Sequence, residues 1–194
     1  MKKTTIKTVL ASVAMLSIIA GMTLMASCKK SDSTVSPVAT MSLYDSLGST
    51  TMVTDPAAPT TKIEKGRLAL RSVVDSTIFV IAVDTSINNE FFSVLLSEVK
   101  VGNTTGFSAL SKNLTDFFCY ATGAKNFTYG GKSMKAAHDP AQNSRMGAKA
   151  DATDFDQFVA DLVKGAKKNG VSDDMINNHI GPLVYTLKTQ VVQK

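Results

Sequence analysis

Apolar side chains recur at helical spacing along four long stretches of the chain. In the first stretch, 67–83, they fall at i, i+3, i+4, i+7, i+8 and i+11, which places them on one face of a helix. These positions are Leu70, Val73, Val74, Thr77, Ile78 and Ile81. β-Branched residues are frequent here, so a strand is the local alternative. The length of the stretch and its period favour a helix.

Three further stretches also predict helices. The stretch 154–170 has an aspartate near its start and lysines near its end, as the helix dipole favours. The stretch 172–191 should be kinked at Gly181–Pro182. The third stretch is 106–123, and its expected inner face is Phe107, Leu110, Leu114, Phe117, Phe118 and Ala121. The expected inner face of 154–170 is Phe155, Phe158, Val159, Leu162, Val163 and Ala166, and that of 172–191 is Ile176, Ile180, Leu183, Leu187 and Val191. Four long amphipathic helices and no convincing strand predict an all-α fold.

Residues 1–27 have the composition of a targeting segment, with three lysines near the start, a long apolar run and small residues before Cys28. This pattern resembles a lipoprotein signal peptide, which implies that Cys28 becomes the acylated first residue. Residues 28–41 are polar and contain proline, so we expect a flexible tether. The sequence therefore predicts an exported protein of the cell envelope, lipid-anchored to a bacterial-type membrane. An uncleaved membrane anchor is the alternative, because about 18 apolar residues can span a bilayer.

The charge balance argues against nucleic acid as a partner. The formal net charge of +5 falls to +2 when the three lysines of the leader are removed. No basic run with interleaved aromatic residues remains. Of the two cysteines, Cys28 is used by the lipid, so Cys119 has no disulfide partner within the mature chain. Its apolar neighbours favour a buried, small hydrophobic residue.

The segment 129–140, YGGKSMKAAHDP, is the best candidate for a functional site. It predicts a short helix between a glycine pair and Pro140, with His138 at its end, which could present a ring nitrogen to a metal. The second histidine, His179, lies off the apolar face of its helix and should face solvent. The chain has no G-x-S-x-G, H-E-x-x-H, paired C-x-x-C or phosphate-loop motif. A ligand-binding protein is therefore favoured over an enzyme.

Five runs in order along 42–192 are similar to those of the group I truncated haemoglobins. They are SLYDSLGS at 42–49, VVDSTIFVIAVDTSINNEFF at 73–92, LSKNLTDFFCYATG at 110–123, YGGKSMKAAHDP at 129–140 and DFDQFVADLVKGAKKNGVSDDMI at 154–176. The resemblance implies a globin-like, truncated two-over-two helical sandwich over 42–194. It also implies haem b as cofactor and reversible binding of a diatomic ligand such as oxygen through the haem iron. The segment 49–66 departs from the family as a long insertion, which we expect to be a solvated loop.

The resemblance also implies roles for individual residues. His138 falls on the position of the proximal iron ligand, and Phe91 or Phe92 on the phenylalanine that stacks against the haem. Haem needs such an axial ligand, an apolar slot and cations near its propionates. The other implied positions are Leu110 and Leu114 over the distal face, Phe118 deeper along that wall, Met134 and Ala137 on the proximal side, and Lys135 and Lys132 near the propionates.

The distal side departs from the family. Many members carry a tyrosine on the second helix that donates a hydrogen bond to the bound gas, whereas the aligned residue here is Ile78, or Phe79 in a register shifted by one. A missing donor forfeits about 1–3 kcal/mol of ligand stabilisation. We therefore expect weak or fast-releasing oxygen binding and inefficient peroxidase or nitric-oxide dioxygenase chemistry.

Three other roles stay open at the level of sequence. The domain could be a haem-free helical lipoprotein that serves as an interaction module on a globin scaffold. The long insertion and the altered distal side are consistent with this alternative. Haem acquisition would require exchangeable haem. Electron transfer would use the same cofactor without a gas ligand.

Overall fold

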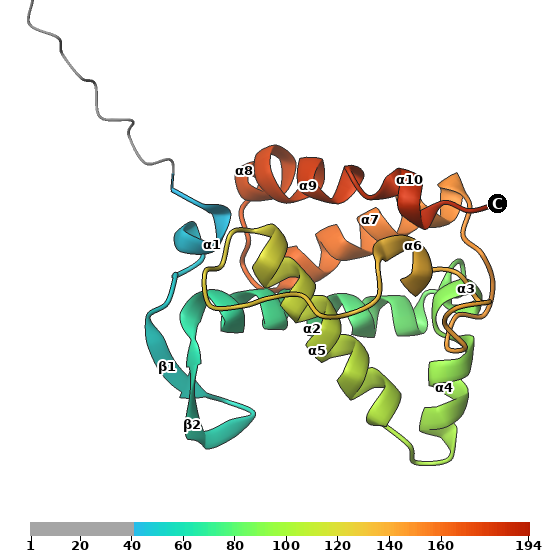
Figure 1. The fold of residues 1–194 in the computed structure, drawn as a ribbon, viewed down its shortest axis with the longest axis horizontal. Helices are drawn as coiled ribbons and strands as arrows, with labels where there is room; N and C mark the ends of the chain where they lie inside the picture. Colours follow the sequence, from blue (N-terminus) through green and yellow to red (C-terminus); the bar gives the residue numbers. More distant parts are fainter. Residues whose placement is uncertain (1–40) are drawn as a thin grey trace, which may run out of the picture. The chain divides into compact units, whose positions relative to one another are not determined.

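The computed structural model describes residues 41–194, which belong to one compact unit (Figure 1). The leader, Cys28 and nearly all of the expected tether lie outside the described residues. Within them, no helix combines the length and apolar character needed to span a bilayer.

Three long helices form where the apolar period predicts them. They are α2 (Lys65–Val83), α5 (Thr105–Ala121) and α7 (Ala152–Lys168), and α2 packs against both of the others. The N-terminus of α7 is fixed by a capping box, because the Asp151 side chain accepts from the Asp154 N–H and the Asp154 side chain accepts from the Asp151 N–H. Local pattern and tertiary packing therefore agree for most of the helical framework.

The prediction of an all-α fold is wrong, because the segment 49–66 contains a β-hairpin. Strands β1 (Met52–Asp55) and β2 (Ala58–Glu64) pair antiparallel, so the described chain is mixed rather than purely helical. Threonine and valine favour strands, and the Asp55 side chain accepts from the Ala57 N–H to close the turn. A strand of four residues is too short for its period to be recognised beside two prolines. The expected solvated loop is thus an ordered hairpin, although most of its side chains are exposed.

The last helix is broken into four pieces. These are α8 (Asp173–Met175), the π-helical turn η1 (Ile176–Ile180), α9 (Gly181–Tyr185) and α10 (Lys188–Val191). The Gly181 N–H donates to the carbonyl of Ile176, five residues earlier, and Pro182 has no N–H with which to continue the ladder. The wider turn rotates the residues that follow, so Val184 is fully buried where a regular period predicts Leu183.

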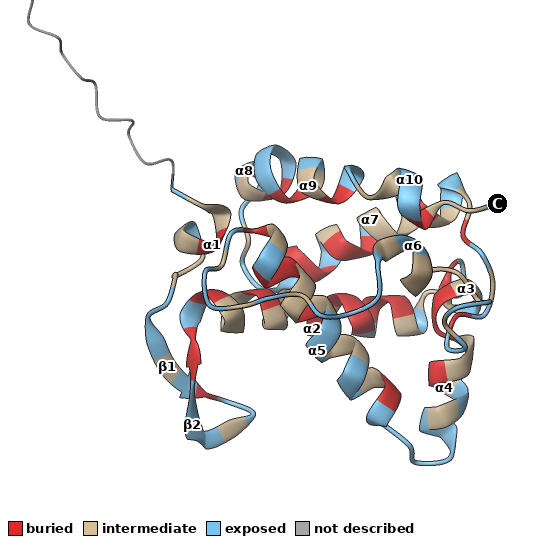
Figure 2. Cartoon of the chain, in the orientation of Figure 1, coloured by how far each residue is buried: buried red, intermediate tan, exposed pale blue. Residues whose placement is uncertain are grey.

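Four short helices complete the described chain: α1 (Leu43–Ser46), α3 (Asn88–Phe91), α4 (Ser93–Lys100) and α6 (Met134–Ala137). Figure 2 shows buried residues concentrated where α2, α5 and α7 face one another and along the inner side of the last helix. Helix α6 lies beside α10. These two helices, together with α2 and α5, frame the site described next.

Candidate functional site

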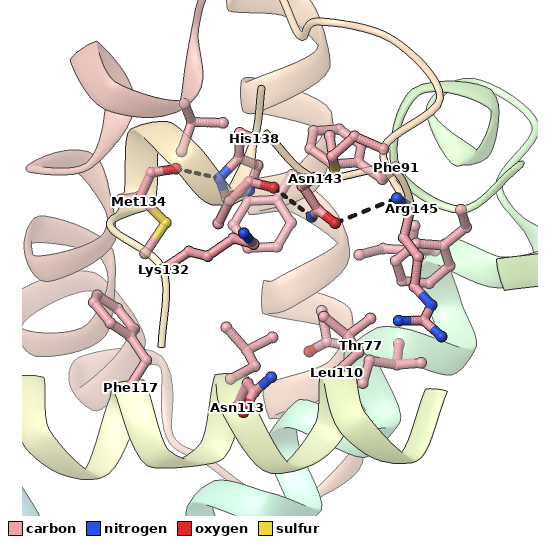
Figure 3. A pocket seen from close by; sticks show the side chains of 18 of the residues that line it. Thr77, Phe91, Leu110, Asn113, Phe117, Lys132, Met134, His138, Asn143 and Arg145 are labelled. Atoms are coloured by element: carbon pink, nitrogen blue, oxygen red, sulfur yellow. Dashed lines mark hydrogen bonds between the residues drawn. The ribbon is translucent and has the colours of Figure 1, made fainter. Parts of the chain in front are cut away.

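A cavity of about 320 Å³ lies between α2, α5, α6 and the end of the last helix (Figure 3). Its volume is at the lower end of the range of about 300–1,000 Å³ that small-molecule sites occupy. Most of its wall consists of aliphatic and phenyl side chains, with polar groups at a few places. Such a lining suits a largely apolar ligand.

The structure brings together almost all of the residues that the sequence singled out. Nine of them line this one cavity: Ile78, Phe91, Phe92, Leu110, Leu114, Phe118, Met134, Ala137 and His138. They come from α2, the α3–α4 corner, α5 and α6, which are distant in sequence. The expected inner side chains Leu110, Leu114 and Phe117 of α5 are only partly buried by protein because they face the cavity.

Lys135, which was expected near the haem propionates, is not among the residues that line the cavity. It is exposed, because on a single helical turn the residue after Met134 points away from the side on which Met134 lies. Lys132, the other predicted cation, does line it. Of the two residues of α2 that were considered for the distal side, Ile78 lines the cavity, whereas Phe79 is 71% exposed.

His138 is the C-cap of α6, and its ring has a defined proton arrangement. Nδ1 lies 2.8 Å from the carbonyl oxygen of Met134. A carbonyl can only accept, so Nδ1 carries the proton and Nε2 carries the lone pair. Burial lowers the pKa of His138, with the bond to Met134 opposing that effect, so the ring is neutral at pH 7. Nε2 makes no hydrogen bond within the described part of the chain.

Aromatic rings fix the surroundings of this imidazole. Phe91 meets the His138 ring edge-on, with centroids 6.0 Å apart and an interplanar angle of 78°. Phe158 of α7 lies behind Phe91, with centroids 6.4 Å apart. Such packing restricts the rotation of the histidine ring.

The wall across the cavity from His138 is formed by α5 and α2 (Figure 3). Leu110, Leu114 and Ile78 contribute no donor. Thr77 also lines it, but its hydroxyl donates to the carbonyl of Val73 on its own helix, 2.8 Å away. Asn113 is the polar side chain that α5 adds to this wall.

Two cations line the cavity, Lys132 and Arg145, and both are exposed. Arg145 Nε lies 3.1 Å from Glu98 Oε1, and Lys132 makes no ion pair among residues 41–194. Sequence reasoning did not assign Arg145, Asn143, Asn113 or Thr77 to the site, although it placed Thr77 on the inner face of its helix. The first two lie on a loop without periodicity, and the signal that could have drawn attention to them is their short distance from His138 in the chain.

The donor set restricts the kind of metal site. No group of three or more histidine, cysteine, aspartate or glutamate side chains converges anywhere in the described residues. Zinc sites draw three or four ligands from the protein, whereas a haem iron requires one strong axial ligand because the porphyrin supplies the rest. One neutral histidine in an apolar cavity is therefore compatible with haem.

A second cavity, of about 550 Å³, lies between α1, α2 and the turn after α7. Its hydroxyl groups are mostly bonded to their own helices, as in the Ser72 Oγ bond to the Leu68 carbonyl and the Thr122 Oγ1 bond to the Phe118 carbonyl. Lys65 is the titratable side chain in its wall. It therefore lacks the convergent polar groups that distinguish the cavity at His138.

No protein-family model matches the chain, and a search among curated proteins also finds no match. The resemblance to truncated haemoglobins accordingly rests on the five sequence runs.

Proposed function

We propose that this protein binds haem b in the cavity at His138 and, as a truncated globin at a membrane surface, reversibly binds a diatomic ligand such as oxygen. The observation that carries the proposal is the state of the imidazole. Its Nδ1 proton is committed to the Met134 carbonyl, its Nε2 has a free lone pair, and its ring lines an apolar cavity. A hydrogen bond at one ring nitrogen that orients the other toward a metal is the usual arrangement of histidine ligands.

The rest of the cavity supports the same ligand. Phe91, Phe92 and Phe118 provide aromatic surfaces for a porphyrin, while Met134 and Ala137 flank the histidine. Lys132 and Arg145, the two cations that line the cavity, are suited to the two propionates. Arginine can bind a carboxylate through two parallel hydrogen bonds, and it would exchange Glu98 for the propionate.

Haem, when bound, supplies an iron atom with a position open to a small diatomic molecule. The protein residues bind and orient the cofactor and exclude water. The lowered pKa of the partly buried His138 ring favours an unprotonated Nε2 at neutral pH. Leu110, Leu114 and Ile78 give the opposite wall no donor, and Asn113 is the side chain there whose amide group could stabilise a ligand that carries partial charge.

The absorption spectrum of purified protein supplied with haem tests the proposal directly. We expect a Soret band and a five-coordinate ferrous spectrum, and we expect His138→Ala to remove both. His179→Ala is the matched control, because His179 is exposed on η1 and should leave the spectrum unchanged. A wild-type protein without a Soret band would refute haem binding and leave the haem-free interaction module as the alternative.

The membrane attachment is proposed from the sequence alone, through acylation of Cys28. Cys28→Ser should move the protein from the membrane fraction to the soluble fraction. Membrane association that persists in this variant would contradict the lipid anchor.

A further inference from the structure

Helix α6, which carries His138, is too short to hold its own shape. It has four residues, Met134–Ala137, and follows a loop with the glycine pair 130–131. An isolated helical turn is unstable because nucleation fixes several residues for each hydrogen bond gained. The orientation of His138 must therefore depend on groups that bind the peptide units of α6 from outside.

The carbonyl groups of α6 are bound by side chains from two other parts of the chain. Asn143 Nδ2 donates to the Ala137 carbonyl at 2.7 Å, and Gln193 Nε2 donates to the Lys135 carbonyl at 2.8 Å. The Met134 carbonyl accepts from His138 Nδ1. Three of the four carbonyl groups of this turn thus have a side-chain donor, and the Lys135 carbonyl also accepts from the His138 N–H at 3.3 Å.

Both external donors come from anchored backbone. The Gln193 N–H donates to the Ala150 carbonyl at 2.9 Å, and Val192 forms a parallel bridge with Ala150 directly before α7. The Asn143 N–H donates to the Asp139 carbonyl at 2.8 Å, and its Oδ1 accepts from the Arg145 N–H at 3.3 Å. Asn143 also lines the cavity beside His138 (Figure 3).

We infer that Asn143 and Gln193 are positioning residues that clamp α6 and thereby hold His138 in the orientation needed to bind iron. The inference rests on the proposed haem function and adds a positioning element to that site, the C-terminal segment after α10. Val191 lines the cavity and Gln193 binds the histidine turn, so the end of the chain forms part of the proximal side.

Gln193→Met and Asn143→Leu test the clamp, because each keeps the approximate size of the side chain and removes the donor. Gln190→Met is the matched control, since Gln190 is exposed on α10 and its side chain does not contact α6 through a hydrogen bond in the described structure. We expect each clamp variant to accelerate haem dissociation by about 2- to 10-fold, the change that corresponds to one hydrogen bond. Gln193→Lys, which retains an N–H donor, should restore most of the wild-type rate.

A general loss of stability would also accelerate haem release, so a second measurement is needed at the iron. The iron–histidine stretching frequency, from resonance Raman spectra of the ferrous protein, should shift in both clamp variants and stay unchanged in Gln190→Met. Wild-type frequencies and dissociation rates in Gln193→Met and Asn143→Leu would overturn the inference and leave haem binding intact.

Hydrogen exchange in the haem-free protein separates the two proposals. Exchange at the amides of Ala136, Ala137 and His138 should be faster in both clamp variants than in the control. If the wild type bound no haem, faster exchange would still support the clamp, and unchanged exchange would reject it.

Discussion

Asp161 is a carboxylate with no exposed surface, in the part of α7 that faces the end of α2. One of its oxygens accepts from Lys164 Nζ at 2.8 Å, and the other makes no hydrogen bond within the described residues. Burial raises the pKa of Asp161, and the nearby carboxylate of Asp84 adds to the rise against the effect of Lys164. A buried charge with one unsatisfied oxygen is destabilising at neutral pH.

The raised pKa fixes the direction of the pH dependence. A group with a raised folded-state pKa contributes stability below its ordinary value of 3.8, and that contribution is lost as the pH rises through the raised value. We therefore expect Asp161→Asn to gain about 1 kcal/mol of unfolding free energy relative to wild type between pH 4 and pH 7. Urea denaturation of both proteins at pH 4 and pH 7 measures this difference in unfolding free energy. Asp156→Asn, at an exposed ion pair on the same helix, should change little.

Ile78 lines the cavity from α2, on the wall across from His138, and its side chain offers no hydrogen-bond donor to a bound gas. If the protein binds haem, Ile78→Tyr should slow oxygen dissociation by about 5- to 150-fold, the range that corresponds to about 1–3 kcal/mol. Phe79→Tyr is the control, because the neighbouring Phe79 is 71% exposed and does not line the cavity. Stopped-flow measurement of the oxygen dissociation rate in the wild type and in both variants tests this expectation. A slow rate in the wild type would contradict the expected apolar distal side.

At the scale of elements, the approach of α2 to α7 depends on Gly165. A Cβ atom built there would lie 2.8 Å from the backbone nitrogen of Thr77 and would also collide with the Thr77 hydroxyl. Backbone atoms inside a helix cannot move aside without shifting the helix, so Gly165→Ala should destabilise the fold by about 1–3 kcal/mol. Gly130→Ala, where the added carbon would meet no atom within 4 Å, is the control in the same urea titration.

The hairpin is fastened to α2 by one bidentate ion pair. Arg71 Nη2 and Nη1 lie 2.6 and 2.9 Å from the two oxygens of Asp55, and this guanidinium lowers the pKa of Asp55 to about 2. A lowered pKa means that the contribution to stability is present above the ordinary value of 3.8 and is lost as the pH falls through about 2. Asp55→Asn should therefore increase hydrogen exchange in β1 and β2 at pH 7. Exchange in α5 should not change, and protection equal to wild type in the hairpin would contradict the fastening role.

For the molecule as a whole, sequence periodicity was informative where many residues share one constraint. The faces of α2, α5 and α7 are set by packing along whole helices, so Leu70, Phe118 and Phe155 could be predicted as core. The hairpin was missed because it has too few residues for a period. Arg145 and Asn143 were missed because tertiary contacts, which leave no local pattern, bring their loop to the cavity. Lys135 was expected near the propionates but does not line the cavity, because the sequence of a single helical turn does not show which of its sides faces the core.

The reactivity of the Cys119 thiol can be used to measure how often the helical core opens locally. Its side chain has no exposed surface, burial raises the pKa of the thiol to about 11, and it is the free cysteine of the described residues. A thiol reagent can therefore reach it only in molecules whose α5 has separated from the core. In a Cys28→Ser background, the labelling rate of Cys119 would measure the population of these open molecules under native conditions. The same reading, taken with and without haem, would show how far an occupied cavity suppresses them.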